Sequence, residues 1–167
     1  EIENIKWDLI EASVDNESKA KAFQQLKNKR IQPFFLWKLE FADLFGSKNG
    51  GFDIVIGNPP YVGEKGNKEL FRGIKHSKFG DKYYSRKMDL FYFFFHLALD
   101  LTKSGGTVSF ITSNYWLTAD GAYKLRSDLK ERANILKLLN FGEMKLFSSA
   151  KGQHNIITLM SKCKSNK

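Results

Sequence analysis

Residues 51–62 of the chain read Gly-Phe-Asp-Ile-Val-Ile-Gly-Asn-Pro-Pro-Tyr-Val. The apolar run from Phe52 to Gly57 predicts a strand, and the next four residues end it on an amide, two prolines and an aromatic ring. Proline fixes its own φ angle and biases the residue before it towards extended conformations, so this segment cannot continue as a helix. A stiff segment directly after a strand suits a functional site.

The tetrapeptide Asn58-Pro59-Pro60-Tyr61 suits methyl transfer to an exocyclic amine. Such a nitrogen is a poor nucleophile, because its lone pair is delocalised into the neighbouring π system. The side-chain oxygen of Asn58 and the backbone carbonyl of Pro59 could each accept one N–H, which would free the lone pair for attack on a methylsulfonium. The ring of Tyr61 would lie flat against the ring that carries the amine. The alternative is a proline-terminated strand beside a buried tyrosine.

Residues 51–62 resemble the catalytic motif of S-adenosylmethionine-dependent N6-adenine DNA methyltransferases, most closely those fused into type IIG restriction-modification enzymes. The resemblance extends over most of the chain, from about Pro33 to Met160. It implies an α/β fold, a partial Rossmann-like methyltransferase sheet of about strands 3 to 7 with flanking helices. It also implies methyl transfer from S-adenosylmethionine to a flipped-out adenine.

The same resemblance implies roles for residues on either side of the tetrapeptide. Asp43 and Leu44 match an acidic residue and an apolar neighbour that contact the cofactor together with Asn58, and Phe147 matches an aromatic that stacks on the target base opposite Tyr61. Taken without the resemblance, Asp43 is equally well a turn residue, and Phe147 equally well packs beneath its own loop.

Residues 62–88 hold eight lysines and arginines against three acidic residues and show no clear period. Aromatic residues lie among these charges, which favours a loop that contacts a nucleic-acid backbone and an unstacked base. The alternative is a solvated, mobile insertion. The basic residues expected to contact DNA are Lys65, Lys68, Arg72, Lys75 and Lys78.

Asn114 and Trp116 are further candidates for DNA contact, because they follow a predicted strand, and open α/β sheets bind ligands at the carboxyl ends of strands. The strands predicted from the pattern are Phe34–Phe41, Phe52–Gly57, Thr107–Thr112, Ile135–Phe141 and Asn155–Ser161. The helices predicted are one that starts after an Asn16 cap and runs to about Lys29, Leu90–Leu101 after an Asp89 cap, and Ala122–Glu131. The second of these is apolar nearly all round and should be buried against a sheet, with His96 in a structural role.

Composition narrows the class of protein. The chain of 167 residues is long enough for about one domain, and its net charge of +9 favours a polyanionic partner. A single cysteine, Cys163, excludes an internal disulfide and a cysteine-cluster zinc site, and no metal is expected. No run approaches the roughly 18 apolar residues that span a membrane, so a soluble, cytoplasmic protein is expected.

The expected organisation is a peripheral helical segment (residues 1–32), a partial catalytic domain (33–161) and a basic tail (162–167). No glycine-rich turn follows a strand before Phe34, so the S-adenosylmethionine pocket should be incomplete. The chain is therefore expected to be an inactive piece that binds the cofactor weakly or not at all. Its partners would be double-stranded DNA and the remainder of a parent polypeptide, which holds the first strands and the target-recognition region, with or without a nuclease.

Three other functions stay open at this point. Glutamine methyltransferases that modify release factors carry the same tetrapeptide, and some RNA amino-group methyltransferases carry a similar one. A third reading is a non-catalytic nucleic-acid-binding module, which the positive charge would also suit.

Overall fold

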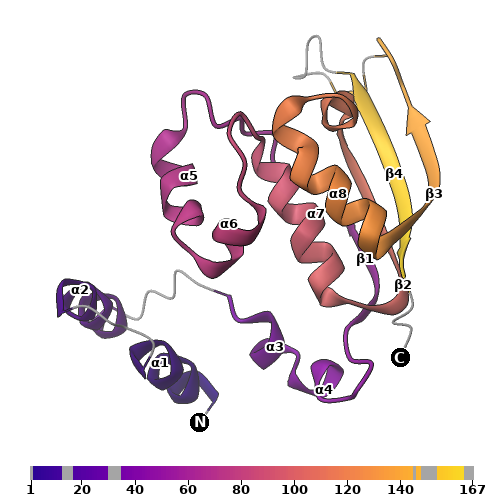
Figure 1. Ribbon diagram of the computed structural model, residues 1–167. Helices are drawn as coiled ribbons and strands as arrows, with labels where there is room; N and C mark the ends of the chain where they lie inside the picture. The colour runs from indigo at the N-terminus through magenta and orange to yellow at the C-terminus, as the bar shows by residue number, and fades with distance from the viewer. Residues whose placement is uncertain (1, 13–16, 30–34, 145, 148–153, 164–167) are drawn as a thin grey trace. The chain divides into compact units, whose positions relative to one another are not determined.

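The computed structural model describes residues 2–12, 17–29, 35–144, 146–147 and 154–163 (Figure 1). The chain divides into two compact units, Glu1–Lys48 and Asn49–Lys167. Among the described residues, no helix is both long and apolar enough to cross a membrane.

The first unit contains α1 (Ile2–Ala12), α2 (Glu17–Asn28), α3 (Trp37–Glu40) and α4 (Ala42–Phe45). The rings of Trp7 and Phe23, one from each of the two longer helices, lie 5.1 Å apart between centroids. α1 and α2 therefore pack through an aromatic contact. The helix predicted to end near Lys29 is confirmed by α2, while its predicted cap, Asn16, lies outside the described residues.

The strand predicted over Phe34–Phe41 is wrong. In the described part of that stretch, residues 37–40 form α3. The same residues also fit a helical spacing. Trp37 and Phe41 are four residues apart, and a helical turn brings such residues together. Their rings stack at an interplanar angle of 17° with 6.1 Å between centroids. Asp43 and Leu44 therefore follow a helical turn and lie in α4, whereas the prediction placed them at the end of a strand.

The second unit is built on a mixed sheet, which has four strands among the described residues. These strands are β1 (Phe52–Gly57), β2 (Thr102–Ser113), β3 (Ala133–Asn140) and β4 (Asn155–Lys162). Their order across the sheet is β1-β2-β4-β3, with β1 parallel to β2 and β4 antiparallel to both of its neighbours. Parallel neighbours need a long connection, and residues 58–101 supply it.

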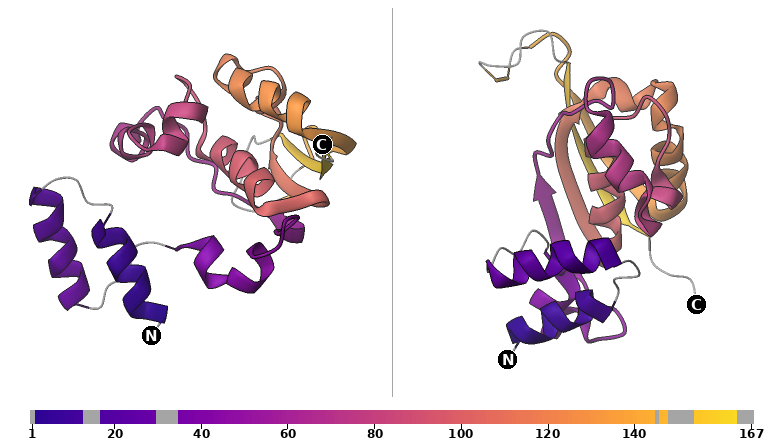
Figure 2. Two further views of the ribbon diagram at one scale, coloured as in Figure 1. Left: turned by 60° about the horizontal axis from the view of Figure 1, so that its bottom comes forward. Right: turned by 90° about the vertical axis from the view of Figure 1, so that its left-hand side faces the viewer.

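Helices α5 (Lys68–Lys75), α6 (Lys78–Tyr83) and α7 (Leu90–Leu101) connect β1 to β2. Two short 3-10 helices, Asn114–Leu117 and Asp120–Ala122, and α8 (Tyr123–Arg132) connect β2 to β3. α7 and α8 lie side by side against one face of the sheet (Figures 1 and 2). The core beneath them is aromatic, since the ring of Phe95 in α7 lies 5.1 Å from Phe110 in β2 and 5.8 Å from Trp116.

The helix predicted over Leu90–Leu101 is confirmed, and so is its cap, since the Asp89 carboxylate accepts from the Phe91 N–H at 3.4 Å. The predicted helix near 122–131 and the last two predicted strands are also confirmed, with small differences at their ends. Residues 62–88 were expected to be a loop, but they contain α5 and α6. Each of these helices is shorter than the stretch over which a helical period becomes visible.

β2 begins at Thr102, earlier than the predicted start at Thr107. The early part of β2 contains an irregular stretch of pairing, because Phe52 pairs with Thr102 whereas Ile54 already pairs with Thr107. Within it, a Cβ on Gly106 would lie 2.6 Å from the Thr102 side chain. Gly105 and Gly106 therefore lie inside β2.

Candidate active site

The tetrapeptide Asn58-Pro59-Pro60-Tyr61 leaves β1 at the carboxyl end of the parallel strand pair. Gly57, the last residue of β1, pairs with Phe110 of β2, so the two strands run towards the same edge of the sheet. A Cβ on Gly57 would lie 3.2 Å from the Phe110 ring, and glycine thus lets the strand pass close to the core. Open α/β sheets bind their ligands at this edge.

The four residues differ in exposure. Asn58 and Pro60 are exposed, Pro59 is buried and Tyr61 is half-buried. Pro59 therefore anchors the segment to the protein interior. The amide of Asn58 remains accessible beside it.

Tyr61 is held at both ends of its side chain. Its hydroxyl donates to the carbonyl oxygen of Ile111 in β2 at 3.1 Å, and its ring packs edge-on against Phe91 with 5.9 Å between centroids. Burial, and then the negative charge of Asp89, raise the pKa of the Tyr61 hydroxyl. The phenol therefore stays protonated and keeps its hydrogen bond at neutral pH.

The residues after Tyr61 pair with the start of α7. The Val62 N–H donates to Asp89 Oδ1 at 3.0 Å, and the Val62 carbonyl accepts from the Leu90 N–H at 2.9 Å. Asp89 thus caps α7 and holds the segment after Tyr61 with one carboxylate. Burial raises the pKa of Asp89, although the hydrogen bonds from the Phe91, Val62 and Leu90 backbone favour its charged form.

Glu64 fixes the turn that precedes α7 in a similar way. Its carboxylate accepts from the Tyr84 hydroxyl and, at 2.6 Å, from the Lys87 N–H. The hydrogen bond to Glu64, followed by burial, raises the pKa of the Tyr84 hydroxyl. Lys87 has a φ of 60°, a left-handed conformation that is uncommon for residues other than glycine. Its carbonyl oxygen faces Gly121, where a Cβ would approach to 2.3 Å.

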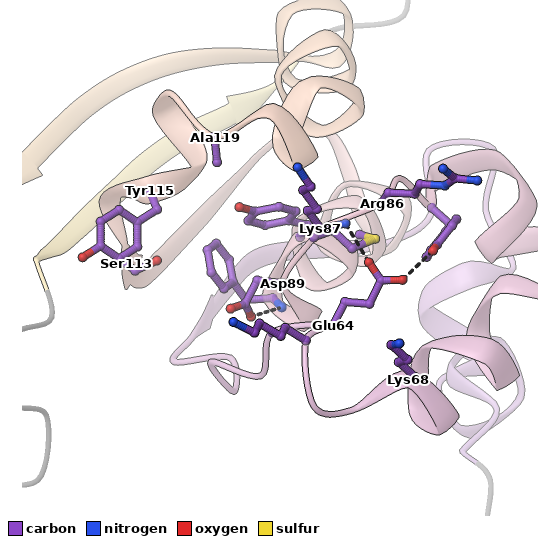
Figure 3. A pocket seen from close by; sticks show the side chains of 14 residues that line it. Glu64, Lys68, Arg86, Lys87, Asp89, Ser113, Tyr115 and Ala119 are labelled. Carbon is purple, nitrogen blue, oxygen red and sulfur yellow. Dashed lines mark hydrogen bonds between the residues drawn. The ribbon is translucent and has the colours of Figure 1, made fainter.

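These segments border a groove of about 850 Å³ (Figure 3). Its positively charged lining residues are Lys65, Lys68, Arg86 and Lys87. Its apolar and aromatic lining residues are Tyr84, Met88, Phe91, Tyr92, Tyr115 and Ala119. Burial, and then the charge of Asp89, raise the pKa of Tyr92 to about 12, so its hydroxyl stays neutral.

Two of the five basic residues expected to contact DNA, Lys65 and Lys68, line this groove. Arg72 pairs with Glu69 within α5. The residues of that set outside the groove lining are Arg72, Lys75 and Lys78. The structure therefore brings Lys65 and Lys68 of the predicted set to the groove, together with Arg86 and Lys87, which that set did not include.

Asn114 and Trp116 lie in the short helix after β2, in different surroundings. Asn114 Nδ2 donates to Asn140 Oδ1 at 3.3 Å, which links the ends of β2 and β3. Trp116 is 4% exposed and packs against Phe95, so contact with DNA would require its ring to leave the core. Tyr115, between them, is 52% exposed and lines the groove. The sequence placed this cluster at a strand end but did not show which ring faces outwards.

Phe147 is half-buried in the connection between β3 and β4, and its role towards a target base stays a prediction. Asp43 is exposed and Leu44 half-buried in α4. Both belong to the other compact unit, so their role towards a cofactor stays a prediction.

His96 lies in the core, away from the groove lining. Its Nδ1 lies 2.6 Å from Asp128 Oδ2, and its ring stacks on Tyr83 with 3.8 Å between centroids. Burial lowers the pKa of His96 despite the carboxylate, so the ring is neutral and donates from Nδ1. These contacts join α6, α7 and α8 and support the structural role predicted for this residue.

The model of the Eco57I restriction-modification methylase family matches residues 1–147. The chain belongs to this family. Among curated relatives, the type II restriction enzyme and methyltransferase RM.Eco57I of Escherichia coli is 27% identical over 108 residues, which are 63% of this chain and 11% of the relative. The type II methyltransferase M.HincII of Haemophilus influenzae is 33% identical over 97 residues, 58% of this chain and 19% of the relative.

A solved structure from Listeria monocytogenes, described as a class I S-adenosylmethionine-dependent methyltransferase, matches with a TM-score of 0.53. The match covers 70% of this chain and 33% of that one at 17% identity, so it supports the fold alone. The predicted fold class is confirmed: a mixed α/β sheet with flanking helices, similar to part of a class I methyltransferase. The matched part of this chain spans 11% of the length of RM.Eco57I and 19% of the length of M.HincII. It spans 22% of the length of a further relative, the type II methyltransferase M.PaeR7I of Pseudomonas aeruginosa.

Proposed function

We propose that this chain is the catalytic part of a longer, cytoplasmic restriction-modification enzyme that methylates N6 of an adenine flipped out of double-stranded DNA. The observation that carries the proposal is the tetrapeptide at the carboxyl end of β1, with the exposed amide of Asn58 beside the fixed ring of Tyr61. The family match and the positive charge of residues 62–88 support DNA as the substrate. The much greater length of the relatives supports a larger parent polypeptide.

Asn58 and Pro59 supply the two acceptors that the reaction needs. The Asn58 side-chain oxygen and the Pro59 carbonyl each accept one N–H of the target amine, which concentrates the lone pair on its nitrogen. These hydrogen bonds strengthen as the nitrogen becomes tetrahedral, so they stabilise the transition state more than the bound substrate. S-adenosylmethionine, when bound, supplies an electrophilic methyl group on a sulfonium.

Tyr61 and Phe147 hold the target base between two rings in this proposal. The contacts of Tyr61 with Ile111 and Phe91 support its role, because a ring that is already fixed loses little conformational entropy when a base stacks on it. Phe147 stacks on the opposite face of the base. Phe147 lies in the connection between β3 and β4, which is part of the same compact unit as Tyr61.

The residues proposed to hold S-adenosylmethionine are Asn58, Asp43 and Leu44. The exposed amide of Asn58 fits this role, because it offers a donor and an acceptor at the sheet edge where such folds bind ligands. The exposed carboxylate of Asp43 suits the adenine amino group, and the adjacent apolar Leu44 suits the face of the adenine ring. The remaining cofactor contacts would come from the parent polypeptide.

DNA contact is assigned to the basic segment after the tetrapeptide. Lys65 and Lys68 would hold phosphates from the groove, and Asn114 would contribute from the end of β2. The remaining basic residues in this set are Arg72, Lys75 and Lys78, and they would act from α5 and α6. Trp116 is left out of this set because its ring is buried.

The test is a product assay with the intact parent enzyme. The enzyme would be incubated with isotopically labelled S-adenosylmethionine and, separately, with unmethylated duplex DNA, RNA and a release factor, and the digests would be analysed by mass spectrometry. Labelled N6-methyldeoxyadenosine from DNA is the expected product, and the Asn58→Ala enzyme should not form it. Labelled methylglutamine or a methylated RNA base as the only product would refute the proposal.

A further inference from the structure

The groove beside the tetrapeptide has two chemically different sides (Figure 3). Lys68, Arg86 and Lys87 lie on the side of α5 and the turn before α7, and Tyr115 lies on the side of β2. An unstacked nucleotide has the same division, with a flat apolar base and an anionic phosphate. The groove volume of about 850 Å³ lies within the range of about 300–1,000 Å³ typical of pockets for small ligands.

The two carboxylates in the groove are already used by the protein. Glu64 accepts hydrogen bonds from the Tyr84 hydroxyl and the Lys87 N–H. Asp89 accepts from the Val62 and Phe91 N–H groups. The four cationic side chains exceed these two acids, so the groove favours an anion.

The position of Lys87 is set by its surroundings. Its left-handed backbone costs free energy, and it is held by Glu64 on one side and by close packing against Gly121 on the other. Strained residues of this kind cluster where a side chain or backbone group must be presented to a ligand. Here the strain presents two consecutive cations, Arg86 and Lys87, to the groove.

The groove also adjoins the catalytic segment. Phe91, which lines the groove, packs against the ring of Tyr61. Ser113 is the last residue of β2, and Tyr115 lies in the short helix that follows it. A strand whose target base lies at Tyr61 would therefore carry its neighbouring nucleotide past this groove.

We infer that the groove binds the nucleotide next to the target base on the same DNA strand. The base of that nucleotide stacks on Tyr115, and its phosphate is held by Arg86 and Lys87. The inference rests on the proposed function for the identity of the strand. The subsite itself is a property of the 167-residue chain and can be measured without cofactor or methyl transfer.

The first experiment measures binding of a short fluorescein-labelled single-stranded oligodeoxynucleotide to the chain by fluorescence anisotropy. Tyr115→Ala should weaken binding about fivefold or more, because one base–aromatic stack is lost. Lys87→Gly removes the charge at a position whose φ suits glycine, so the fold should be kept. It should weaken binding and lower the slope of log K against log salt concentration by about 1.

Matched controls are available on α8. Tyr123 is 55% exposed, close to the exposure of Tyr115, and lies outside the groove lining, as does the exposed Lys130. Tyr123→Ala and Lys130→Ala should bind the oligonucleotide like the parent chain. Circular dichroism of each variant checks that it is folded.

The second experiment places 5-iododeoxyuridine on either side of the target adenine and irradiates the complex. Mass spectrometry should find the cross-link on Tyr115 for one of the two positions. The inference fails if the unmodified chain binds no oligodeoxynucleotide at low salt, if it prefers RNA, or if Tyr115→Ala and Lys87→Gly bind normally. Failure of adenine methylation in the intact enzyme would leave these binding results unchanged, so the two proposals fail separately.

Discussion

The backbone N–H of Val62 donates to the carboxylate of Asp89 at 3.0 Å. The same carboxylate oxygen accepts from the Phe91 N–H at the first turn of α7, so the residue that caps this buried helix also fixes the segment after Tyr61. The segment from Asn58 to Val62 is therefore attached to the core at Pro59, at Tyr61 and at Val62. Its rigidity comes from tertiary contacts as well as from its two prolines.

Asp89→Ala should lower the free energy of unfolding by about 2–3 kcal/mol, because a helix cap and the acceptor of a second backbone N–H are both lost. Asp89→Asn keeps an acceptor oxygen and should lose less than half as much. Urea unfolding followed by tryptophan fluorescence measures both values. Equal losses in the two variants would mean that the negative charge matters more than the hydrogen bonds.

Gly80 and Gly73 should respond in opposite ways to alanine. A Cβ on Gly80 would lie 1.9 Å from the Ile74 carbonyl oxygen, so Gly80→Ala should destabilise the fold by about 1–3 kcal/mol or more. Gly73 lies in α5 with nothing within 4 Å of its added Cβ, so Gly73→Ala should gain about 0.5–1 kcal/mol from helix propensity. Thermal unfolding of the pair tests the packing of α5 against α6, and a stable Gly80→Ala variant would contradict it.

The sequence predicted best where one pattern dominated. The continuous apolar run of α7, with Asp89 before it, allows little except a buried helix, and β1 could be read from its run into two prolines. The pattern failed at Trp37 and Phe41, whose alternation fits a strand and whose spacing of four fits a helical turn. The helical turn is closed by the hydrogen bond from the Phe41 N–H to the Trp37 carbonyl at 3.0 Å and brings the two rings together, and neither contact is visible in the sequence.

The candidate site was predicted in part for a similar reason. Asn58 and Tyr61 stand in a local pattern, so they could be named from the sequence. The clamp between Glu64 and Lys87 joins residues far apart in the chain, and the outward turn of Tyr115 depends on the helix after β2. Trp116 was named as a candidate and Tyr115 was not, because residue types alone do not show which of the two rings faces outwards.

Stability should fall as the pH is lowered from about 8 to 5.5, through His96. Burial keeps the pKa of His96 below its ordinary value of 6.5, so the unfolded chain binds the proton first as the pH falls. The slope due to this one residue cannot exceed about 1.4 kcal/mol per pH unit. His96→Gln should flatten the dependence of the urea-unfolding free energy on pH over this range, and an unchanged slope would contradict the prediction.

The fold should lose further stability in strong acid, because of Asp128. Burial alone would raise the pKa of its carboxyl, but the hydrogen bonds from His96 and Arg132 outweigh it and hold the pKa at about 2, below the ordinary 3.8. A lowered carboxyl pKa stabilises the fold above about pH 4, and this contribution disappears as the pH falls towards 2. Asp128→Asn should remove this acid-dependent part, which unfolding at pH 4 and pH 2.5 would measure.

Removal of the Tyr61 hydroxyl and removal of its ring should have different effects on methylation. Tyr61→Phe loses the hydrogen bond to Ile111 and about 1 kcal/mol of stability, but it keeps the ring and should methylate within a few-fold of the parent enzyme. Tyr61→Ala also loses the stack on the base, which is worth about 1–3 kcal/mol. Fluorescence of 2-aminopurine at the target position reports the flipped base, and equal signals from both variants would exclude Tyr61 as the stacking ring.

Asn58 should act mainly on the chemical step. The intact enzyme with Asn58→Ala should bind DNA within a few-fold of the unchanged enzyme, because the exposed amide accepts its strongest hydrogen bond only in the transition state. Its single-turnover rate, at saturating cofactor and DNA, should fall by well over tenfold. Asn58→Asp keeps an acceptor oxygen and should retain more activity than Asn58→Ala. A rate loss below about tenfold in Asn58→Ala, or about 1.4 kcal/mol, would show that the two acceptors do not activate the amine.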